Sequence, residues 1–453
     1  MRVELEIPLS LNDILIAVKA KSSASPTAII NAVCTDTREV KKGDLFIAIN
    51  GERQSAEAYI PEAIAKGCYV ITQTEISGAI RVDDTVDALL AISRLYKSKL
   101  KPLHTIAITG SVGKSTTVKF LSRILSQKYA VHSPIGNFNN HIGVPITVLS
   151  SHKNTDALVL EMGMNHKKEI SRLSMYTNPS IAVITSIGTA HIGNLGTRED
   201  IALAKLEIAD GMTDGALLLP IGEPLLSGIE KATYVGRNSS LSRFSLDNTS
   251  DEAYNLRSPL GDIHGITFFD KREHLLYDLA FAIVSAQLMG LSKEEIINGV
   301  GTISEGDLRQ RFIVSDDFLI FDDSYNASLE SICADLKFIC TYDRPKGAFL
   351  GDVLELGDSA ALIHERIGRE AAISNFDRLY LYGNFAMDTA RGAIDAGMPA
   401  DNIYVNTDVS APEISIDQIK KNHLPNEIIL FKASHKLRLD KIADLFKMRR
   451  DGE

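Results

Sequence analysis

A glycine-rich turn between an apolar run and a helix-like segment constrains this chain more than any other feature. Residues 104–110 read HTIAITG, and SVGKSTTVKFLSRIL follows directly. A strand, a tight glycine turn and the start of a helix let several backbone N–H groups point at one anion, and the helix dipole adds to their attraction. A full Walker A motif has another glycine five positions before Gly113, where this chain has Ile108. The sequence therefore predicts a shortened phosphate-binding loop.

The residue types in this loop match what phosphate binding requires. Gly110 and Gly113 permit the turn and a close approach of phosphate, Lys114 supplies a positive charge for the β and γ phosphates, and the Ser115 hydroxyl suits Mg²⁺. An ordinary glycine turn that caps a helix does not explain a lysine followed by three hydroxyl residues. The residues predicted to bind the nucleotide here are Thr109, Gly110, Ser111, Val112, Gly113, Lys114, Ser115 and Thr116.

Two further polar residues stand where apolar runs of the same region end. Glu161 closes ALVLE, and His191 stands three positions after the end of the run IAVITSIG. The carboxyl ends of parallel strands meet at one edge of a sheet, so a carboxylate and an imidazole there could share a metal ion. Taken singly, each could instead be a solvated or structural residue at a strand end.

The chain organisation predicts an α/β protein of three domains, since 453 residues exceed what one ordinary core accommodates. Residues 1–100 are expected to form a small mixed α/β domain. Residues 101–308 alternate short apolar runs with helix-like segments, which indicates a parallel sheet covered on both faces. Residues 309–453 repeat this alternation and are expected to form a small Rossmann-like domain. The segment 221–275 shows no clear period.

Composition excludes several other classes of protein. A net charge of −10 and a pI near 5.6 argue against general affinity for nucleic acid or an anionic membrane. No apolar run reaches the roughly 18 residues that a membrane helix needs, and the first residues do not form a signal peptide. The spacings of Cys34, Cys68, Cys333 and Cys340 do not suit zinc, so we expect buried reduced thiols. These features predict a cytoplasmic protein.

Several motifs in order along the chain resemble those of the Mur ligases of peptidoglycan assembly. In the central region they are TGSVGKST (109–116), GNFNNHIGVPITVL (136–149), LEMGMNHKKEI (160–170), SIGTAHIGNLG (186–196) and EDIALAKLEI (199–208). FDDSYNASLES (321–331) and GDVLELG (351–357) are similar to motifs of the family's third domain. The resemblance spans nearly the whole chain and is strongest over 104–210 and 321–357. A shortened P-loop is normal for this family.

The resemblance implies ATP-driven amide formation. A substrate carboxylate attacks the γ-phosphate to give an acyl phosphate and ADP, and an amine then displaces phosphate through a tetrahedral intermediate. The implied partners are a UDP-linked muramoyl tripeptide and D-alanyl-D-alanine, and the implied state is a monomer. Such a reaction brings two anions together, so it needs cations and fixed N–H donors more than an acid or a base.

The resemblance also assigns roles to single residues around the metal ions. Lys114 and the loop amides would hold the β and γ phosphates, and Ser115 with Glu161 would bind one Mg²⁺. His191 would help to bind a second Mg²⁺. Lys205 stands where the family carries a carbamylated lysine, whose carbamate is a carboxylate-like metal ligand. The alternative for Lys205 is a plain surface lysine on a helix.

Further residues are implied by the resemblance to face the substrates. The implied ATP-binding residues outside the loop are Asn139, Asn140, Arg309, Asp323, Tyr325 and Asn326. Asp36, Thr37 and Arg38 lie in CTDTREVKKGDLFIAINGE (34–52), which is similar to the family's uridine-nucleotide segment. The ATP-binding residues outside the loop have an alternative role in turns, loops and linkers, where Asp and Asn are common.

Four departures from the family pattern concern the edges of the site. Gln54–Glu57 replaces an Asp-Gly-His sequence, and His274, Leu275 and Asp278 replace an HN…N pattern on the adenine side. Ser328-Leu329 replaces Asn-Pro, and His435 stands where arginine is common. Two alternatives therefore stay open: a Mur-like amide ligase with another acid and amine, and a P-loop NTPase or non-catalytic paralogue.

Overall fold

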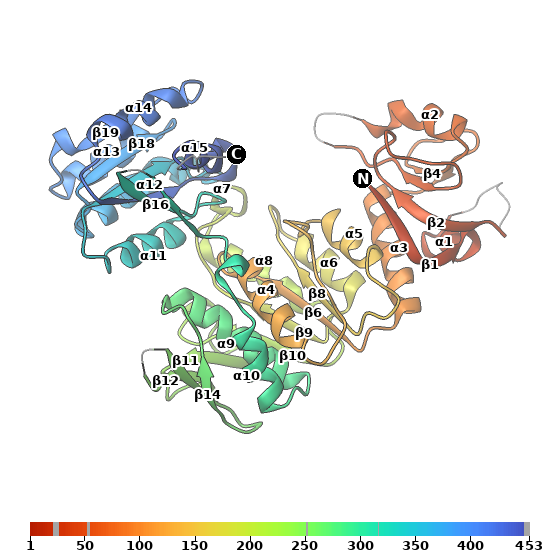
Figure 1. Cartoon of the computed structure of the whole chain (residues 1–453). Coiled ribbons are helices and arrows are strands. Elements are labelled where there is room, and N and C mark those ends of the chain that lie inside the picture. Colours follow the sequence, from red (N-terminus) through yellow and green to blue (C-terminus); the bar gives the residue numbers. More distant parts are fainter. Residues whose placement is uncertain (21–26, 52–54, 251, 316, 448–453) are drawn as a thin grey trace, which may run out of the picture.

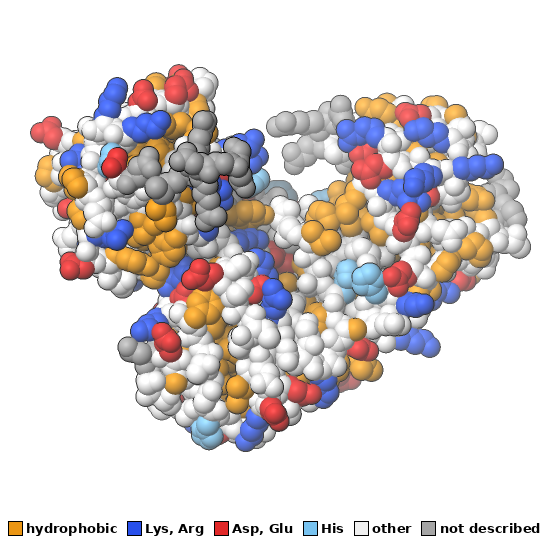
Figure 2. Space-filling view, in the orientation of Figure 1, with side chains coloured by type: hydrophobic (Ala, Val, Ile, Leu, Met, Phe, Trp, Pro, Cys, Tyr) orange, Lys and Arg blue, Asp and Glu red, His pale blue; other side chains and the backbone are white. Residues whose placement is uncertain are grey.

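The computed structural model describes residues 1–20, 27–51, 55–250, 252–315 and 317–447. Three sheets follow one another along the chain, and each has its own covering helices (Figure 1). The domain around the second sheet lies at the base, and the first and third domains stand above it on opposite sides. The space-filling view shows an open hollow between these two upper domains (Figure 2).

The first sheet has five strands in sequence order, with β1 antiparallel to β2 and the others parallel. Its strands are β1 (Arg2–Ser10), β2 (Ile29–Cys34), β3 (Leu45–Ile47), β4 (Tyr69–Thr72) and β5 (Ile80–Arg81). Helices α1 (Leu11–Ala17) and α2 (Ile60–Ala65) belong to this domain. The Ser10 hydroxyl accepts a hydrogen bond of 3.0 Å from the Asp13 N–H, which caps the start of α1.

The second sheet has nine strands in the order β14-β13-β12-β11-β10-β9-β6-β8-β7. Its strands are β6 (His104–Thr109), β7 (Val131–His132), β8 (Ala157–Glu161), β9 (Ile181–Ile184), β10 (Ala216–Pro220), β11 (Ala232–Arg237), β12 (Phe244–Asn248), β13 (Ala253–Arg257) and β14 (Ile263–Thr267). The strands from β7 to β12 are parallel, whereas β13 runs antiparallel to both of its neighbours, β12 and β14. The segment without a clear period thus adds four short strands to one side of the sheet.

Helices cover both faces of this central sheet, as the alternation predicted. They are α4 (Lys114–Leu125), α5 (Gly143–Leu149), α6 (Glu169–Thr177), α7 (Ile192–Leu195), α8 (Arg198–Leu206), α9 (Glu273–Leu288) and α10 (Lys293–Gly301). Helices α4, α9 and α10 pack together on one face, and α5 and α6 lie on the other. The chain passes from β6 to β7 and β8 on one side before it crosses to β9 on the other, so a ligand site is expected at the carboxyl end of β6.

The third sheet has the order β15-β16-β20-β17-β18-β19 and is parallel except for β15. Its strands are β15 (Arg311–Val314), β16 (Phe318–Asp322), β17 (Lys346–Gly351), β18 (Arg378–Tyr382), β19 (Ile403–Asn406) and β20 (Glu427–Lys432). Its helices are α11 (Leu329–Ile339), α12 (Ala360–Ile373), α13 (Ala386–Asp395), α14 (Pro412–Asn422) and α15 (Leu439–Asp444). Short 3-10 helices occur at Ala56–Tyr59, Glu207–Ala209, Pro224–Leu226, Glu305–Asp307, Gly357–Ser359, Ala400–Asn402 and His435–Leu437.

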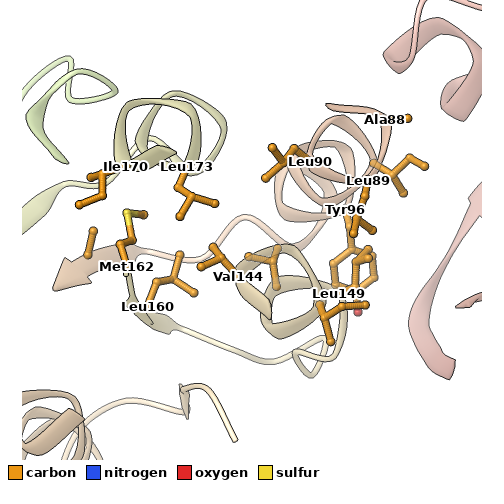
Figure 3. Close-up of a cluster of buried hydrophobic side chains, with 14 of the residues drawn as sticks. Ala88, Leu89, Leu90, Tyr96, Val144, Leu149, Leu160, Met162, Ile170 and Leu173 are labelled. Carbon is orange, nitrogen blue, oxygen red and sulfur yellow. The ribbon is translucent and has the colours of Figure 1, made fainter. Parts of the chain in front are cut away.

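Helix α3 (Thr85–Leu100) joins the first domain to the central one through a continuous apolar core. Leu90 and Tyr96 of α3 belong to the same cluster of buried side chains as residues of α5, β8 and α6, which Figure 3 shows. The Tyr96 hydroxyl also donates a hydrogen bond of 2.8 Å to the Ser151 carbonyl. The third domain has two separate cores, and the α7 residue Ile192 packs against one of them. The first and central domains are therefore one packed body, whereas the third meets that body through smaller contacts.

The structure corrects the expectation for the cysteines. Cys34 and Cys68 are buried, but Cys333 is half-buried and Cys340 is exposed, and all four thiols are free. Across the described ranges, no helix combines the length and apolarity needed to cross a membrane.

Candidate active site

The glycine turn lies at the carboxyl end of β6, where β6 stops at Thr109 and α4 starts at Lys114. Gly113 adopts a φ of 92°, in the left-handed region that favours glycine. A Cβ at Gly113 would lie 2.2 Å from the Asp278 carboxyl, and a Cβ at Gly110 would lie 1.9 Å from the Thr185 hydroxyl. Both glycines are therefore required by close packing from neighbouring elements.

The loop that follows β9 holds the glycine turn in place. The Ser111 N–H donates to the Ser186 carbonyl at 3.0 Å, and the Val112 N–H donates to the Ser186 hydroxyl at 2.9 Å. The Gly188 N–H in turn donates to the Ser111 hydroxyl at 2.8 Å. The phosphate-binding turn and the 186–190 segment thus form one hydrogen-bonded unit.

Lys114 folds back over the turn. Its Nζ donates to the Gly110 carbonyl at 2.7 Å and to the Ser111 carbonyl at 3.4 Å. Burial lowers the pKa of this ammonium, the Glu161 carboxylate opposes that effect, and the Arg309 guanidinium adds to it. A bound phosphate would place a full negative charge beside the ammonium, whereas the two carbonyls offer it only the partial charges of their oxygens.

Ser115, Glu161 and Asn139 form a polar cluster beside the turn. The Ser115 hydroxyl donates to Glu161 Oε2 at 2.6 Å, and Asn139 Nδ2 donates to Glu161 Oε1 at 2.8 Å. Arg309 Nη2 donates a hydrogen bond to the Ser115 hydroxyl from the start of the third domain. A hydroxyl and a carboxylate in contact are oxygen ligands of the kind that Mg²⁺ prefers.

These residues border a cavity of about 280 Å³ whose walls come from the central and third domains. The predicted ATP-binding residues that line it are Ser111, Val112, Gly113, Lys114, Ser115, Thr116, Asn139, Arg309, Asp323, Tyr325 and Asn326. Thr109 is fully buried, while Asn140 accepts hydrogen bonds from the Ile142 and Gly143 N–H groups where α5 begins. Lys432 and His435 line the cavity as well. One cavity therefore collects residues from segments far apart in the sequence.

Aromatic and cationic side chains meet on the third-domain wall of this cavity. The Arg309 guanidinium lies 3.9 Å from the centre of the Tyr325 ring, which suits a cation–π contact. The His435 ring lies 5.3 Å from that of Tyr325. His435, in the position where the family commonly has arginine, therefore remains part of the site.

His191 is held by the third domain. Its Nδ1 lies 2.5 Å from Glu355 Oε2, and the Gly193 N–H donates to the Glu355 carbonyl at 3.0 Å. Ala190 lines the phosphate cavity, but His191 is not among its lining residues. Among the residues the structure describes, no three His, Cys, Asp or Glu side chains gather as a metal site. The structure thus pairs His191 with Glu355, and its predicted metal role stays a prediction.

Lys205 lies on α8 and only 2% of it is exposed, so it is not a plain surface lysine. Burial lowers the pKa of its amine well below the ordinary value, and repulsion from the Lys114 ammonium lowers it further. A buried lysine near a second cation favours the neutral amine. This is the form that reacts with carbon dioxide.

The predicted uridine-nucleotide residues lie after β2 in the first domain, apart from the phosphate cavity. Arg38 Nε and Nη2 donate to the Asp36 carboxylate at 2.9 and 2.5 Å, and the Arg38 side chain is otherwise well exposed. Thr37 is buried, and its carbonyl accepts a hydrogen bond of 2.9 Å from Lys66 Nζ. Of the departing stretch Gln54–Glu57, Gln54 lies outside the described residues.

The sequence reasoning missed Lys432, Asp335, Glu330 and Glu355. Lys432 ends β20, just as Glu161 ends β8, so the strand-end argument applied to both. Asp335 and Glu330 lie on α11, and Glu355 lies in the loop after β17. Glu330 and Glu355 lie within the motifs 321–331 and 351–357, but the motifs do not single them out, and nothing in its local sequence distinguishes Asp335 from an ordinary surface acid.

Comparison with known proteins agrees with the family that the sequence motifs indicate. Residues 108–277 match the family described as Mur ligase middle domain. A Bacillus subtilis (strain 168) protein named UDP-N-acetylmuramoyl-tripeptide–D-alanyl-D-alanine ligase is 34% identical over 428 residues, which cover 91% of this chain and 92% of the relative. A Synechocystis protein of the same name is 31% identical, and the match covers 90% of each chain. A crystal structure of MurF from Acinetobacter baumannii matches with a TM-score of 0.87 at 27% identity, over 98% of this chain and 100% of that one.

The three-domain α/β fold with its shortened P-loop defines a member of the Mur ligases, and the chain belongs to that family. These relatives are all ligases that carry one name. Within the family, the chain groups with MurF.

Proposed function

We propose that this protein is an ATP-dependent ligase that joins D-alanyl-D-alanine to UDP-N-acetylmuramoyl-tripeptide. The observation that carries the proposal is the phosphate cavity, where the Lys114 turn and the Ser115–Glu161 pair face Arg309 and Asp323 of the third domain. The names of the relatives from Bacillus subtilis and Synechocystis support the choice of substrates.

The phosphates of ATP would lie in the turn between β6 and α4. The turn's N–H groups and the positive end of the α4 dipole attract the β and γ phosphates, and Lys114 moves from the loop carbonyls to them. Arg309 supplies a second cation at the same cavity. Together these cations offset the repulsion between the γ-phosphate and the substrate carboxylate, which must meet for an acyl phosphate to form.

Ser115 and Glu161 would hold a Mg²⁺ ion, since their oxygens are already in contact and Asn139 keeps Glu161 in place. When bound, magnesium neutralises phosphate charge in this kind of reaction. Lys205 would add a ligand after carbamylation, in which its neutral amine attacks carbon dioxide and releases one proton. His191 would serve a second ion once it is free of Glu355.

The muramoyl substrate would reach the cavity through the hollow between the first and third domains (Figure 2). Asp36, Thr37 and Arg38 would bind its uridine nucleotide at the far end. We further propose that the enzyme is a cytoplasmic monomer that does not bind nucleic acid, in keeping with its negative net charge.

A phosphate-release assay with each reactant omitted in turn tests the proposal. We expect release only when ATP, Mg²⁺, UDP-N-acetylmuramoyl-tripeptide and D-alanyl-D-alanine are all present, with the joined product seen by mass spectrometry. Release that needs a different acid or amine would identify a Mur-like ligase of other specificity. Release without any acid or amine would identify an NTPase and overturn the proposal.

Carbamylation of Lys205 has its own test. Protein equilibrated with ¹³C-bicarbonate should show one protected carbamate carbon signal by NMR, and Lys205→Ala should lack it. A signal that persists in Lys205→Ala would assign the carbamate elsewhere, and no signal in either protein would remove it from the proposal.

A further inference from the structure

Three ionisable side chains cluster at the carboxyl end of β20, beside the phosphate cavity. Lys432 is the last residue of β20, Asp323 follows β16, and Asp335 lies on α11. Their exposed fractions are 1%, 8% and 2%. Groups of this kind are buried only when they are paired, so the arrangement of their contacts is informative.

The Lys432 ammonium lies between the two carboxyl groups. Its Nζ donates to Asp323 Oδ2, lies 3.4 Å from the Asp323 carbonyl and lies 2.8 Å from Asp335 Oδ2. The backbone of Asp323 is itself fixed, because its N–H donates to the Phe431 carbonyl at 3.0 Å. Asp335 therefore reaches the nucleotide site through Lys432 and Asp323.

The cluster has two acids and one base, so one carboxyl group keeps a proton at neutral pH if the buried charges are to balance. Burial raises the pKa of Asp335, and the neighbouring Asp323 carboxylate raises it further. The Lys432 ammonium holds the pKa of Asp323 below its ordinary value. The proton thus belongs to Asp335, while Asp323 carries the negative charge.

This charge distribution matters because Asp323 borders two adjoining cavities. With Lys432 it lines the phosphate cavity, and with Asp335 it lines a neighbouring cavity of about 210 Å³ that Gly113 also borders. A nucleotide with its phosphates in the turn would therefore lie in a cavity that Asp323 borders. The direction of the Asp323 carboxylate and the position of the Lys432 ammonium are then both relevant to nucleotide binding.

We propose that Asp335 is a positioning residue for the nucleotide, whose carboxyl group keeps Lys432 and Asp323 in their places between the two cavities. This inference rests on the proposed function, since it concerns the same nucleotide site. Without Asp335, the Lys432 ammonium has one carboxylate partner and an empty space beside it, into which it is free to turn.

The proton on Asp335 gives the proposal a pH signature. The titratable groups around the pair are Lys432 from β20, Asp323 after β16, His274 and Asp278 from α9 and Glu330 from α11, each of which lines one of the two cavities. Burial keeps His274 neutral by lowering its pKa to about 4, and burial raises the pKa of Asp278 well above its ordinary value. Loss of the Asp335 proton adds a buried negative charge near an anionic nucleotide. The KM for ATP in the wild-type protein should therefore rise as the pH increases above neutrality.

The test compares Asp335→Ala, Asp335→Asn and a matched control, Glu427→Gln, which changes a buried carboxyl group at the opposite end of β20. Steady-state kinetics from pH 6.5 to 9 would give KM for ATP and kcat, and calorimetry would give ADP affinity without turnover. We expect Asp335→Ala to weaken ADP binding and raise KM for ATP by about tenfold, because Lys432 loses the carboxyl group that lies 2.8 Å from its Nζ.

The variant Asp335→Asn distinguishes a positioning role of the side chain from one in which it only fills space. The asparagine side chain resembles the protonated carboxyl group, so Asp335→Asn should keep the wild-type KM at pH 7 and lose its rise at higher pH. Unchanged ADP affinity and KM in Asp335→Ala would overturn the inference, as would a pH rise of equal size in Asp335→Asn. Because ADP binding needs no ligation, failure of the proposed function would show separately, as a folded nucleotide-binding protein without product.

Discussion

Glu330 of the third domain accepts two hydrogen bonds from Thr189 of the central domain, 2.8 Å from the backbone N–H and 3.2 Å from the hydroxyl. Thr189 belongs to the segment whose Gly188 N–H donates to the Ser111 hydroxyl of the phosphate-binding turn. A continuous set of hydrogen bonds therefore connects the nucleotide site to helix α11. The contact between His191 and Glu355 lies three residues further along the same segment from Gly188.

Glu330→Ala should lower kcat by about three- to tenfold, because it removes an acceptor that holds the 186–190 segment, and one such contact contributes about 1 kcal/mol. The unfolding temperature should change little, since the side chain is only half-buried. A matched control is Glu413→Ala, which removes an exposed acid from the first turn of α14 in the same domain. Equal kcat values for the two variants would contradict the role of this connection.

Domain closure should accompany substrate binding, because the third domain supplies one wall of the cavity and has a separate core. Small-angle scattering should report a more compact particle with an ATP analogue and the acid substrate than without them. Glu355→Gln, which weakens the contact with His191, should alter the profile of the free protein and leave the liganded profile as it is. Identical profiles under all conditions would count against closure.

Lys114→Ala should reduce turnover by at least about a hundredfold, because it removes a cation that stabilises the negative charge of the reacting phosphate. Removal of one charge-stabilising group from an enzyme active site commonly has an effect of this size. The protein should stay folded, because the hydrogen bonds of Lys114 are made to carbonyls within its own loop. Circular dichroism and a thermal unfolding curve would check this. The control is Lys293→Ala, an exposed lysine in the first turn of α10, for which we expect wild-type turnover.

Glu161→Gln should raise the Mg²⁺ concentration needed for half-maximal activity by about tenfold, the scale on which one charged ligand contributes. Glutamine keeps the shape of the side chain and its contact with Ser115, so folding should be unaffected. A magnesium titration at saturating ATP provides the measurement. A half-maximal concentration equal to that of the wild type would remove Glu161 from the metal site.

Glu427 should make the third domain less stable as the pH rises. Burial raises the pKa of Glu427 from 4.5 to about 7, so its contribution is fully present below pH 4.5 and is lost as the pH rises through 7. The free energy of unfolding therefore falls by roughly 3 kcal/mol at most. Glutamine does not titrate, so Glu427→Gln should lose less stability than the wild type between pH 5 and pH 8 in urea unfolding. Parallel losses in the two proteins would show that Glu427 does not titrate in this range.

Much of the site could be predicted because its signals are local. The shortened loop, the strand before it and the helix after it are adjacent in the chain, and Glu161 closes its own strand. The individual strands β11 to β14 escaped prediction because residues 221–275 show no clear period. The antiparallel pairs β12–β13 and β13–β14 are also not revealed by any local pattern. The burial of Lys205 also escaped, since the helix pattern of α8 fits a surface lysine equally well.

The sequence alone determined the phosphate-binding turn, since glycine positions, apolar runs and a helix start act within a few residues of one another. Only the tertiary structure decided that Lys432 meets Asp323, 109 residues earlier in the chain, and that His191 turns to Glu355. Such meetings depend on strand order and on the packing of one domain against another. The physical reason is that the electrostatic attraction between two charged side chains depends on their distance in the folded protein, and no local sequence pattern encodes that distance.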